Sequence, residues 1–219
     1  MNDLRKYMTT VGLLTVILAV FTSGASGSPI LDQSQELFYG GSAFFNYVSL
    51  AQTFTPAIGG ELDHVDLHIE GFLGVGNPTY PATISIVQTV ADVPSGAVLG
   101  AVNVPGFVVG WNSIDFLGES VILNAGTKYG IVLANNDIRK DIAPTDAFNV
   151  QWDINPYSAG ALWERTLATG VWQLAVFDTS SPPGVADGAF RTYMVVPEPA
   201  SLGLLLIAGL ALLRHRRSA

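Results

Sequence analysis

The feature that most constrains the fold of this chain is a two-residue alternation of apolar and polar side chains, clearest in Asp63–Glu70. There Val65, Leu67 and Ile69 occupy one phase and polar residues the other, which is typical of a β-strand with one buried and one solvated face. No stretch between residues 28 and 196 has a convincing helical period, and turn-forming residues recur at short intervals. The pattern predicts an all-β domain.

Other segments repeat this pattern and indicate the size of the sheets. Ala82–Ile86 and Phe148–Trp152 alternate in the same way, and Trp172–Val176 contains a further apolar stripe. Lys128–Leu133 is apolar on both faces, as expected of a central strand, and Phe190–Val195 closes the domain. About ten such strands in one domain predict a two-sheet antiparallel β-sandwich of jelly-roll type.

The N-terminus has the three parts of a secretory signal peptide. Arg5 and Lys6 provide a basic start, and Thr10–Phe21 provides an apolar segment of signal-peptide length. Small residues follow, and they allow cleavage after Ala25 or after Gly27. We therefore expect residues 1–27 to form a signal helix that directs export, which leaves a β-sandwich domain over residues 28–196.

The C-terminal residues 197–219 combine a rigid tripeptide, a short apolar segment and a basic tail. The tripeptide is Pro197-Glu198-Pro199, and the basic residues are Arg214, Arg216 and Arg217. The 14 apolar residues 200–213 would make a helix of about 21 Å, against the roughly 30 Å of a bilayer core. A short transmembrane helix of this kind is more typical of a processing signal than of a permanent anchor.

These three elements, in this order, resemble the PEP-CTERM sorting signal of exported bacterial proteins. Residues 196–200 match the tripeptide region, Leu202–Leu213 matches the helix, and the arginines match the basic end. The resemblance implies transient anchoring in the inner membrane and cleavage at or near Pro197-Glu198-Pro199 by an exosortase. The positive-inside rule then predicts that Arg214, Arg216 and Arg217 lie on the cytoplasmic side.

A second resemblance covers most of residues 52–195 and depends on the order of several short motifs. The motifs are Gln52-Thr53-Phe54-Thr55, Pro94-Ser95-Gly96, Leu123–Leu133, Tyr157–Trp163 and Ala189–Tyr193. In this order they are similar to the bacterial surface modules called choice-of-anchor R domains. The resemblance implies a β-sandwich and no particular chemistry.

Charge and composition exclude several classes of function. Residues 28–196 contain 16 of the 18 acidic and 5 of the 10 basic residues, so the domain carries a net charge of −11. Such a charge argues against binding nucleic acid or anionic lipid. The chain has no cysteine, which excludes a disulfide, a thiolate metal site and a cysteine nucleophile.

Two groups of residues are candidate metal ligands, and each has an ordinary structural alternative. His64, Asp66 and His68 share one strand face, so they form either part of a zinc or iron site or a solvated polar face. The oxygen-rich residues that suit calcium, or else a polar turn, are Asn135, Asn136, Asp137, Asp141, Asp178 and Asp187. We predict no cofactor other than this candidate calcium.

Aromatic residues next to an irregular segment suggest a carbohydrate site. Trp152 and Trp172 lie in the apolar phase of their strands and are expected in the core, whereas Tyr157 and Trp163 flank Ser158-Ala159-Gly160 and are free to be exposed. Tyr157 and Trp163 are therefore the candidate sugar-stacking pair, with packing under loops as the alternative. The chain lacks a nucleophile elbow, an HExxH zinc motif and a phosphate-binding glycine loop, so we predict that it is not an enzyme.

Together these patterns predict an exported protein of the bacterial cell surface or extracellular matrix. Its partners in sorting are the export translocon, the inner membrane and an exosortase. A structural or adhesive role fits the acidic sandwich, and a carbohydrate-binding module that acts on exopolysaccharide is the alternative.

Overall fold

The computed structural model describes residues 27–37, 40–44, 48–73, 81–135, 147–154, 157–166, 170–177 and 184–196. All of its strands lie between Pro29 and Val195, and residues 29–196 form one compact unit. The predicted signal peptide, apart from Gly27, and the predicted sorting segment 197–219 lie outside the described residues. Within the described part of the chain, no helix has the length and hydrophobicity that a membrane crossing requires.

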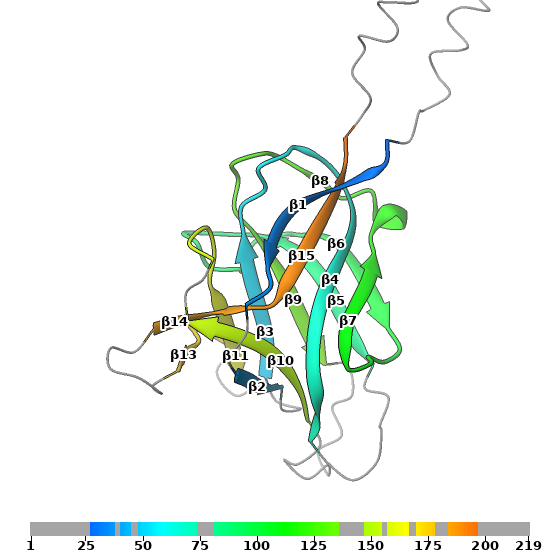
Figure 1. Cartoon of the computed structure of the whole chain (residues 1–219). Coiled ribbons are helices and arrows are strands. Elements are labelled where there is room, and N and C mark those ends of the chain that lie inside the picture. The colour runs from blue at the N-terminus through cyan, green and yellow to red at the C-terminus, as the bar shows by residue number, and fades with distance from the viewer. Residues whose placement is uncertain are drawn as a thin grey trace, which may run out of the picture. The chain divides into compact units, whose positions relative to one another are not determined.

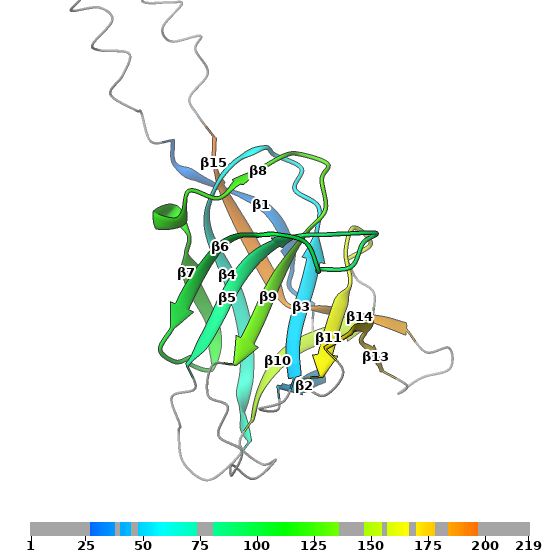
Figure 2. The same cartoon turned by 180° about the vertical axis from the view of Figure 1, so that it is seen from behind.

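The strands form two antiparallel sheets (Figure 1). The nine-stranded sheet has the order β1 (Pro29–Gln35), β15 (Phe190–Val195), β4 (Gly60–Leu73), β10 (Ala147–Ile154), β14 (Gly184–Gly188) and β13 (Val176–Phe177), and β2 (Gly40–Phe44), β7 (Gly110–Asp115) and β8 (Ile122–Leu123) pair with its members. The six-stranded sheet, nearer the viewer in Figure 2, has the order β12 (Trp172–Leu174), β11 (Leu162–Thr166), β3 (Val48–Phe54), β9 (Tyr129–Asn135), β5 (Ala82–Gln88) and β6 (Val98–Val104).

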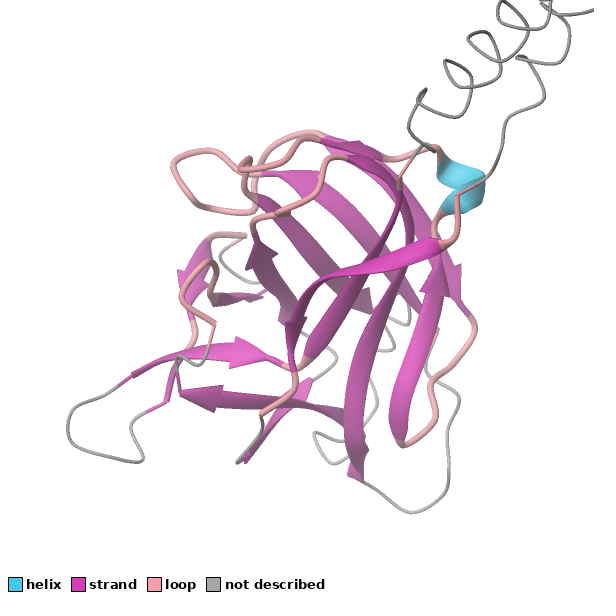
Figure 3. Cartoon of the chain, turned by 45° about the horizontal axis from the view of Figure 1, so that its top comes forward, coloured by secondary structure: helices cyan, strands magenta, loops and turns pink. Residues whose placement is uncertain are grey.

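The two sheets pack face to face, as the two layers of strands in Figure 3 show. The described residues include one short helix, η1 (Leu117–Glu119), and are otherwise strands, turns and loops. The prediction of an all-β fold with two antiparallel sheets is therefore confirmed.

Strand β4 confirms the alternation from which the fold was predicted. It pairs with β15 over residues 61–67 and with β7 over residues 64–69, so it lies inside the sheet. Val65, Leu67 and Ile69 are buried between the sheets. On the other phase His64 and His68 are half-buried, and Asp66 is buried beside His64 and Arg191 on the outer face. The period of two thus distinguishes the inner from the outer face of this strand.

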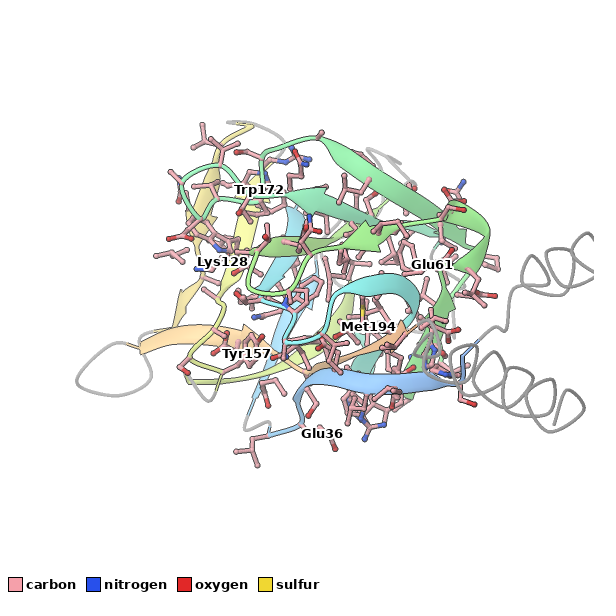
Figure 4. All side chains as sticks on the ribbon, turned by 90° about the horizontal axis from the view of Figure 1, so that it is seen from above. Glu36, Glu61, Lys128, Tyr157, Trp172 and Met194 are labelled. Atoms are coloured by element: carbon pink, nitrogen blue, oxygen red, sulfur yellow. The ribbon has the colours of Figure 1, made fainter. Side chains whose placement is uncertain are left out.

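The core between the sheets consists of aliphatic and aromatic side chains from both layers. Phe54 of β3 lies 6.2 Å, between ring centroids, from both Tyr129 of β9 and Phe190 of β15, so the rings join the two sheets. Met194 is fully buried and lies between the layers in Figure 4. Each large side chain buried here contributes about 1.5–3 kcal/mol, so the sheets are held together mainly by this layer.

The apolar stripe predicted within Trp172–Val176 is not a single core-facing strand. The chain leaves the six-stranded sheet after β12, and β13 then pairs with β14 of the nine-stranded sheet. Ala175, between the two strands, is buried. Trp172 lies opposite Arg165 and packs against Ala51, Val87 and Val132 on the outer face of the six-stranded sheet, so its predicted place in the core between the sheets is wrong.

Candidate functional site

Tyr157 belongs to the core and is not an exposed sugar-stacking residue. It precedes β11, is only 9% exposed, and packs edge-on against Phe190 with the ring centroids 5.2 Å apart. Its hydroxyl donates a hydrogen bond to Gln33 Oε1 (2.9 Å) and accepts one from the Thr55 N–H (3.2 Å). The expectation that Tyr157 is free to be exposed is therefore wrong.

A buried group of polar residues lies beside Tyr157. The Asp187 carboxylate, fully buried, accepts hydrogen bonds from Gln52 Nε2 (3.0 Å) and from the Tyr157 N–H (3.2 Å). Gln52 also accepts a hydrogen bond from the Gly188 N–H (2.6 Å), and its amide donates to the Thr53 carbonyl (2.9 Å). These bonds connect β3, β14 and the segment before β11, which gives Asp187 a structural role at the junction of the two sheets.

The loop after Tyr157 is held against β3 with almost no free space. A Cβ atom at Gly160 would lie 1.8 Å from the Thr53 carbonyl oxygen, so no larger residue fits without moving the backbone. The Thr53 hydroxyl accepts a hydrogen bond from the Ala161 N–H (2.9 Å), and the Thr55 hydroxyl donates to the Ala159 carbonyl (3.0 Å). The loop that follows Tyr157 is thus fixed to the strand beneath it.

The predicted histidine cluster lies on the outer face of the nine-stranded sheet, hereafter the histidine face (His64, Asp66, His68, Trp111, Arg191 and Tyr193). His64 Nδ1 contacts the Asp63 carboxylate, and its Nε2 lies 3.9 Å from Asp66 Oδ1. The His64 ring stacks on Tyr193, with centroids 4.0 Å apart. His68 meets Trp111 edge-on at 5.0 Å. The cross-strand register of β4 with β15 and β7 brings these side chains together.

Arg191 at the centre of this face is almost completely paired. Its guanidinium donates two hydrogen bonds to the Glu36 carboxylate, both 2.9 Å long, and lies 3.8 Å from Asp66 Oδ2 and 4.0 Å from the Trp111 ring centroid. The hydrogen bond from Arg191 lowers the pKa of Glu36, and the same bond raises the pKa of Arg191. The described groups of this face compensate one another, as in a structural ion-pair network.

The candidate metal ligands lie in different parts of the chain, and some of them fall outside the described residues. In the described part of the chain, no three His, Asp or Glu side chains are arranged to hold a metal ion. Asn136, Asp137, Asp141 and Asp178 lie outside the described residues, and Asn135 is the last residue of β9. Asp187 is the buried carboxylate described above, so its environment differs from the exposed turn that the sequence suggested.

Trp163 lies on the outer face of the six-stranded sheet, hereafter the tryptophan face (Trp163, Arg165, Trp172 and Leu174). Across the strands Trp163 pairs with Ala51 and Leu174, and Arg165 pairs with Trp172. The Arg165 guanidinium lies 4.7 Å from the Trp172 ring centroid. Both tryptophans are half-buried, and they pack against a small apolar cluster of Ala51, Val87 and Val132. Figure 4 shows Trp172 and Glu36 on opposite sides of the domain.

The charge of this face differs sharply from that of the rest of the chain. Among the described outward positions of the six strands, Arg165 is the one that carries a formal charge, although the chain as a whole carries −8. Within the described residues, no carboxylate lies at ion-pair distance from Arg165. The indole Nε1 of Trp163 is shielded from solvent and has no hydrogen-bond acceptor in this part of the structure.

A small cavity lies between the sheets, next to the buried polar group. It has a volume of about 20 Å³ and is lined mainly by aliphatic residues such as Leu50, Ile131 and Leu162. A space of this size holds about one water molecule and is far too small for a sugar or an organic cofactor. This cavity is therefore not a binding site for a sugar.

Sequence patterns missed Arg165 and Trp172 as members of a shared surface. Arg165 lies two residues after Trp163, so the strand period alone places both on one face, and this signal was available. The pairing of β11 with β12, which brings Trp172 to the same face, could not be read from the sequence.

No known family model matches the chain, and no curated protein is significantly similar to it in sequence.

Proposed function

We propose that this chain is an exported bacterial protein of the cell surface or extracellular matrix, processed at both ends. The observation that carries the proposal is the position of the fold between the predicted cleavage points. The strands run from Pro29 to Val195, while the predicted cuts follow Ala25 or Gly27 and fall at or near Pro197-Glu198-Pro199. Both cuts would therefore leave every described strand intact.

The pairing of the first and last strands adds to this support. Pro29 of β1 pairs with Val195 of β15, so both ends of the domain leave the same end of the sheet. A pull from a membrane segment at either terminus would act on β1 or β15, which are hydrogen-bonded to each other along their length. Cleavage of both terminal segments would detach the domain from the membrane. A domain built in this way suits temporary anchoring followed by release or transfer.

The proposed route begins with the translocon, to which residues 1–27 would direct the chain. Residues 200–213 then hold the protein in the inner membrane, with Arg214, Arg216 and Arg217 on the cytoplasmic side. An exosortase cuts near Glu198, so the chain is the substrate of an enzyme in this proposal, which assigns no catalytic activity to the chain. The resemblance of this segment to the PEP-CTERM signal supports the route.

The mature domain, a jelly-roll-like sandwich in this proposal, has a structural or adhesive role in the matrix. Its acidic charge favours solubility outside the cell. Binding of exopolysaccharide is the second candidate role, and the tryptophan face favours it because two indole rings lie on an outer sheet face.

Intact-mass spectrometry of the protein recovered from the cell surface tests the proposed sorting. We expect a species that begins at residue 26 or 28 and ends near residue 196. The variant Glu198→Gln should retain the C-terminal segment in the membrane fraction, whereas Glu119→Gln, an exposed carboxylate within the domain, should be processed normally. A surface protein that still contains Arg217 would contradict the proposal.

A further inference from the structure

We propose that the tryptophan face binds a carboxylate-bearing polysaccharide, with Trp163 and Trp172 as the stacking rings and Arg165 as the group that pairs with the sugar carboxylate. This inference rests on the carbohydrate-binding role proposed above, and it specifies the surface and the charge of the ligand. It replaces the predicted pair of Tyr157 and Trp163, because Tyr157 is buried in the core.

The arrangement of the two indole rings suits a chain of sugars. Trp163 is directly opposite Leu174, and Trp172 is directly opposite Arg165, so the two tryptophans are diagonal neighbours on adjacent strands. Diagonal neighbours in an antiparallel pair are about 7–8 Å apart, which allows two neighbouring residues of one polysaccharide to contact two rings. Aromatic rings present a flat, polarisable face to the C–H groups of a sugar ring.

Arg165 supplies a positive charge on a face whose other described strand positions are uncharged. Its guanidinium is held over the Trp172 ring at 4.7 Å and has no carboxylate partner within the described residues. A guanidinium donates two parallel hydrogen bonds to a carboxylate, and contact with an aromatic ring limits the motion that binding would have to freeze. By contrast, Arg191 on the histidine face already donates two such bonds to Glu36.

The rest of the face carries no negative charge at its described strand positions. Ser49, Ala51 and Thr53 of β3 are themselves buried beneath their neighbours, so the part of this surface that a ligand can reach is formed by the tryptophans and Arg165. No acidic residue occupies a described outward position of these six strands, so these positions add no Coulomb repulsion against an anionic ligand. Charge complementarity therefore favours a carboxylated polymer over a second copy of this acidic chain.

The test compares two polymers with the same backbone. The exported protein, purified in its mature form, is titrated with polygalacturonate and with fully methyl-esterified polygalacturonate, which lacks the negative charges. We expect Trp172→Ala to weaken binding of polygalacturonate about tenfold. Arg165→Gln should weaken it about fivefold and leave the methyl ester unaffected, because only the carboxylate contact is lost.

Matched variants separate loss of the site from loss of the fold. Arg191→Gln makes the same chemical change on the histidine face and should leave polygalacturonate binding unchanged. Trp172→Phe keeps an aromatic ring and should retain most of the affinity even if Trp172→Ala folds poorly. The thermal midpoint of each variant is measured beside its binding.

Four results would overturn the inference. Binding that survives Trp172→Ala and Arg165→Gln would place the sugar site elsewhere and leave the carbohydrate-binding role standing. Equal binding of the two polymers would refute the assigned ligand charge. No binding to either polymer, or a concentration-dependent dimer that Trp172→Ala abolishes, would refute the inference, while the proposed sorting would be judged by mass spectrometry alone.

Discussion

Replacement of Tyr157 by phenylalanine should destabilise the domain although the aromatic ring is kept. The substitution preserves the contact with Phe190 and removes only the hydroxyl, which bonds to Gln33 Oε1 at 2.9 Å and to the Thr55 N–H at 3.2 Å. Both partners are half-buried, so each would lose a hydrogen bond that water replaces only in part. The variant therefore isolates the structural role of this residue from its apolar burial.

The expected size of this effect follows from the two lost bonds. A hydrogen bond contributes about 0.5–1.5 kcal/mol net, and a buried group left unsatisfied costs about 1–3 kcal/mol. We therefore expect Tyr157→Phe to lower the free energy of unfolding by about 1.5–3 kcal/mol. For a domain of this size, about 2–4 °C of thermal midpoint corresponds to each kcal/mol, so the midpoint should fall by roughly 3–12 °C.

The pH dependence of stability provides a second, independent readout of the same residue. Burial raises the pKa of Tyr157 above its ordinary value of 10, the Thr55 N–H opposes this shift, and the negative charges of Asp32 and Asp187 add to it. The unfolded chain therefore loses this proton at a lower pH than the folded domain does. The resulting stability is fully present below pH 10 and is lost as the pH rises through the folded-state pKa, so Tyr157→Phe should flatten this alkaline decline.

Urea denaturation followed by tryptophan fluorescence measures both effects, and Tyr193→Phe is the matched control. Tyr193 lies on the outer face, stacked on His64, and no hydrogen bond to its hydroxyl is present in the described structure. Its substitution should change stability by less than about 0.5 kcal/mol. If Tyr157→Phe proved as mild as this control, the structural role of the hydroxyl would be refuted.

Two further substitutions test other contacts. Gly160→Ala should lower the free energy of unfolding by more than about 3 kcal/mol, because the new Cβ would lie 1.8 Å from the Thr53 carbonyl oxygen. Thermal melting followed by circular dichroism measures this loss, and a melting curve like that of the parent would contradict the close packing. Glu36→Gln should remove about 0.5–1 kcal/mol near neutral pH. Since Arg191 lowers the pKa of Glu36, the contribution of the pair is present above the unfolded-state pKa near 4.5 and is lost as the pH falls through the lower folded-state value. Urea midpoints between pH 3 and pH 7 should therefore converge for the parent and the variant at the acid end.

The strand pattern predicted the layers of the fold because burial on one face of a strand is a local property. In β4 the side chains alternate between the core and the outer face of the sheet, and the sequence records that alternation directly. The same reasoning identified β9 as a central strand, since it is apolar on both faces and pairs with β3 and β5. Strand existence and phase were therefore accessible without any knowledge of partners.

The errors arose where a residue's environment depends on distant segments. Tyr157 lies in a turn, which has no period, and it is buried because Gln33 and Thr55, more than 100 residues away, close over its hydroxyl. Trp172 was assigned to the core because Trp172–Val176 was treated as one strand. The passage to the other sheet at Ala175 is a matter of tertiary topology, and no local propensity records it.

The two arginines of the sheets show why the candidate site could not be chosen from composition. Arg165 and Arg191 both lie in strands beside aromatic residues, and nothing local distinguishes them. Arg191 is neutralised by Glu36, which is 155 positions away in the chain, whereas Arg165 stacks on Trp172 and has no described acidic partner. The chain as a whole carries a net charge of −8, yet on the outer face of the six-stranded sheet the one charged residue among the described strand positions is an arginine. Because an unpaired guanidinium beside an aromatic ring retains its full capacity to bind a carboxylate, Arg165 is the position at which a change of one charge should alter ligand binding without altering the fold.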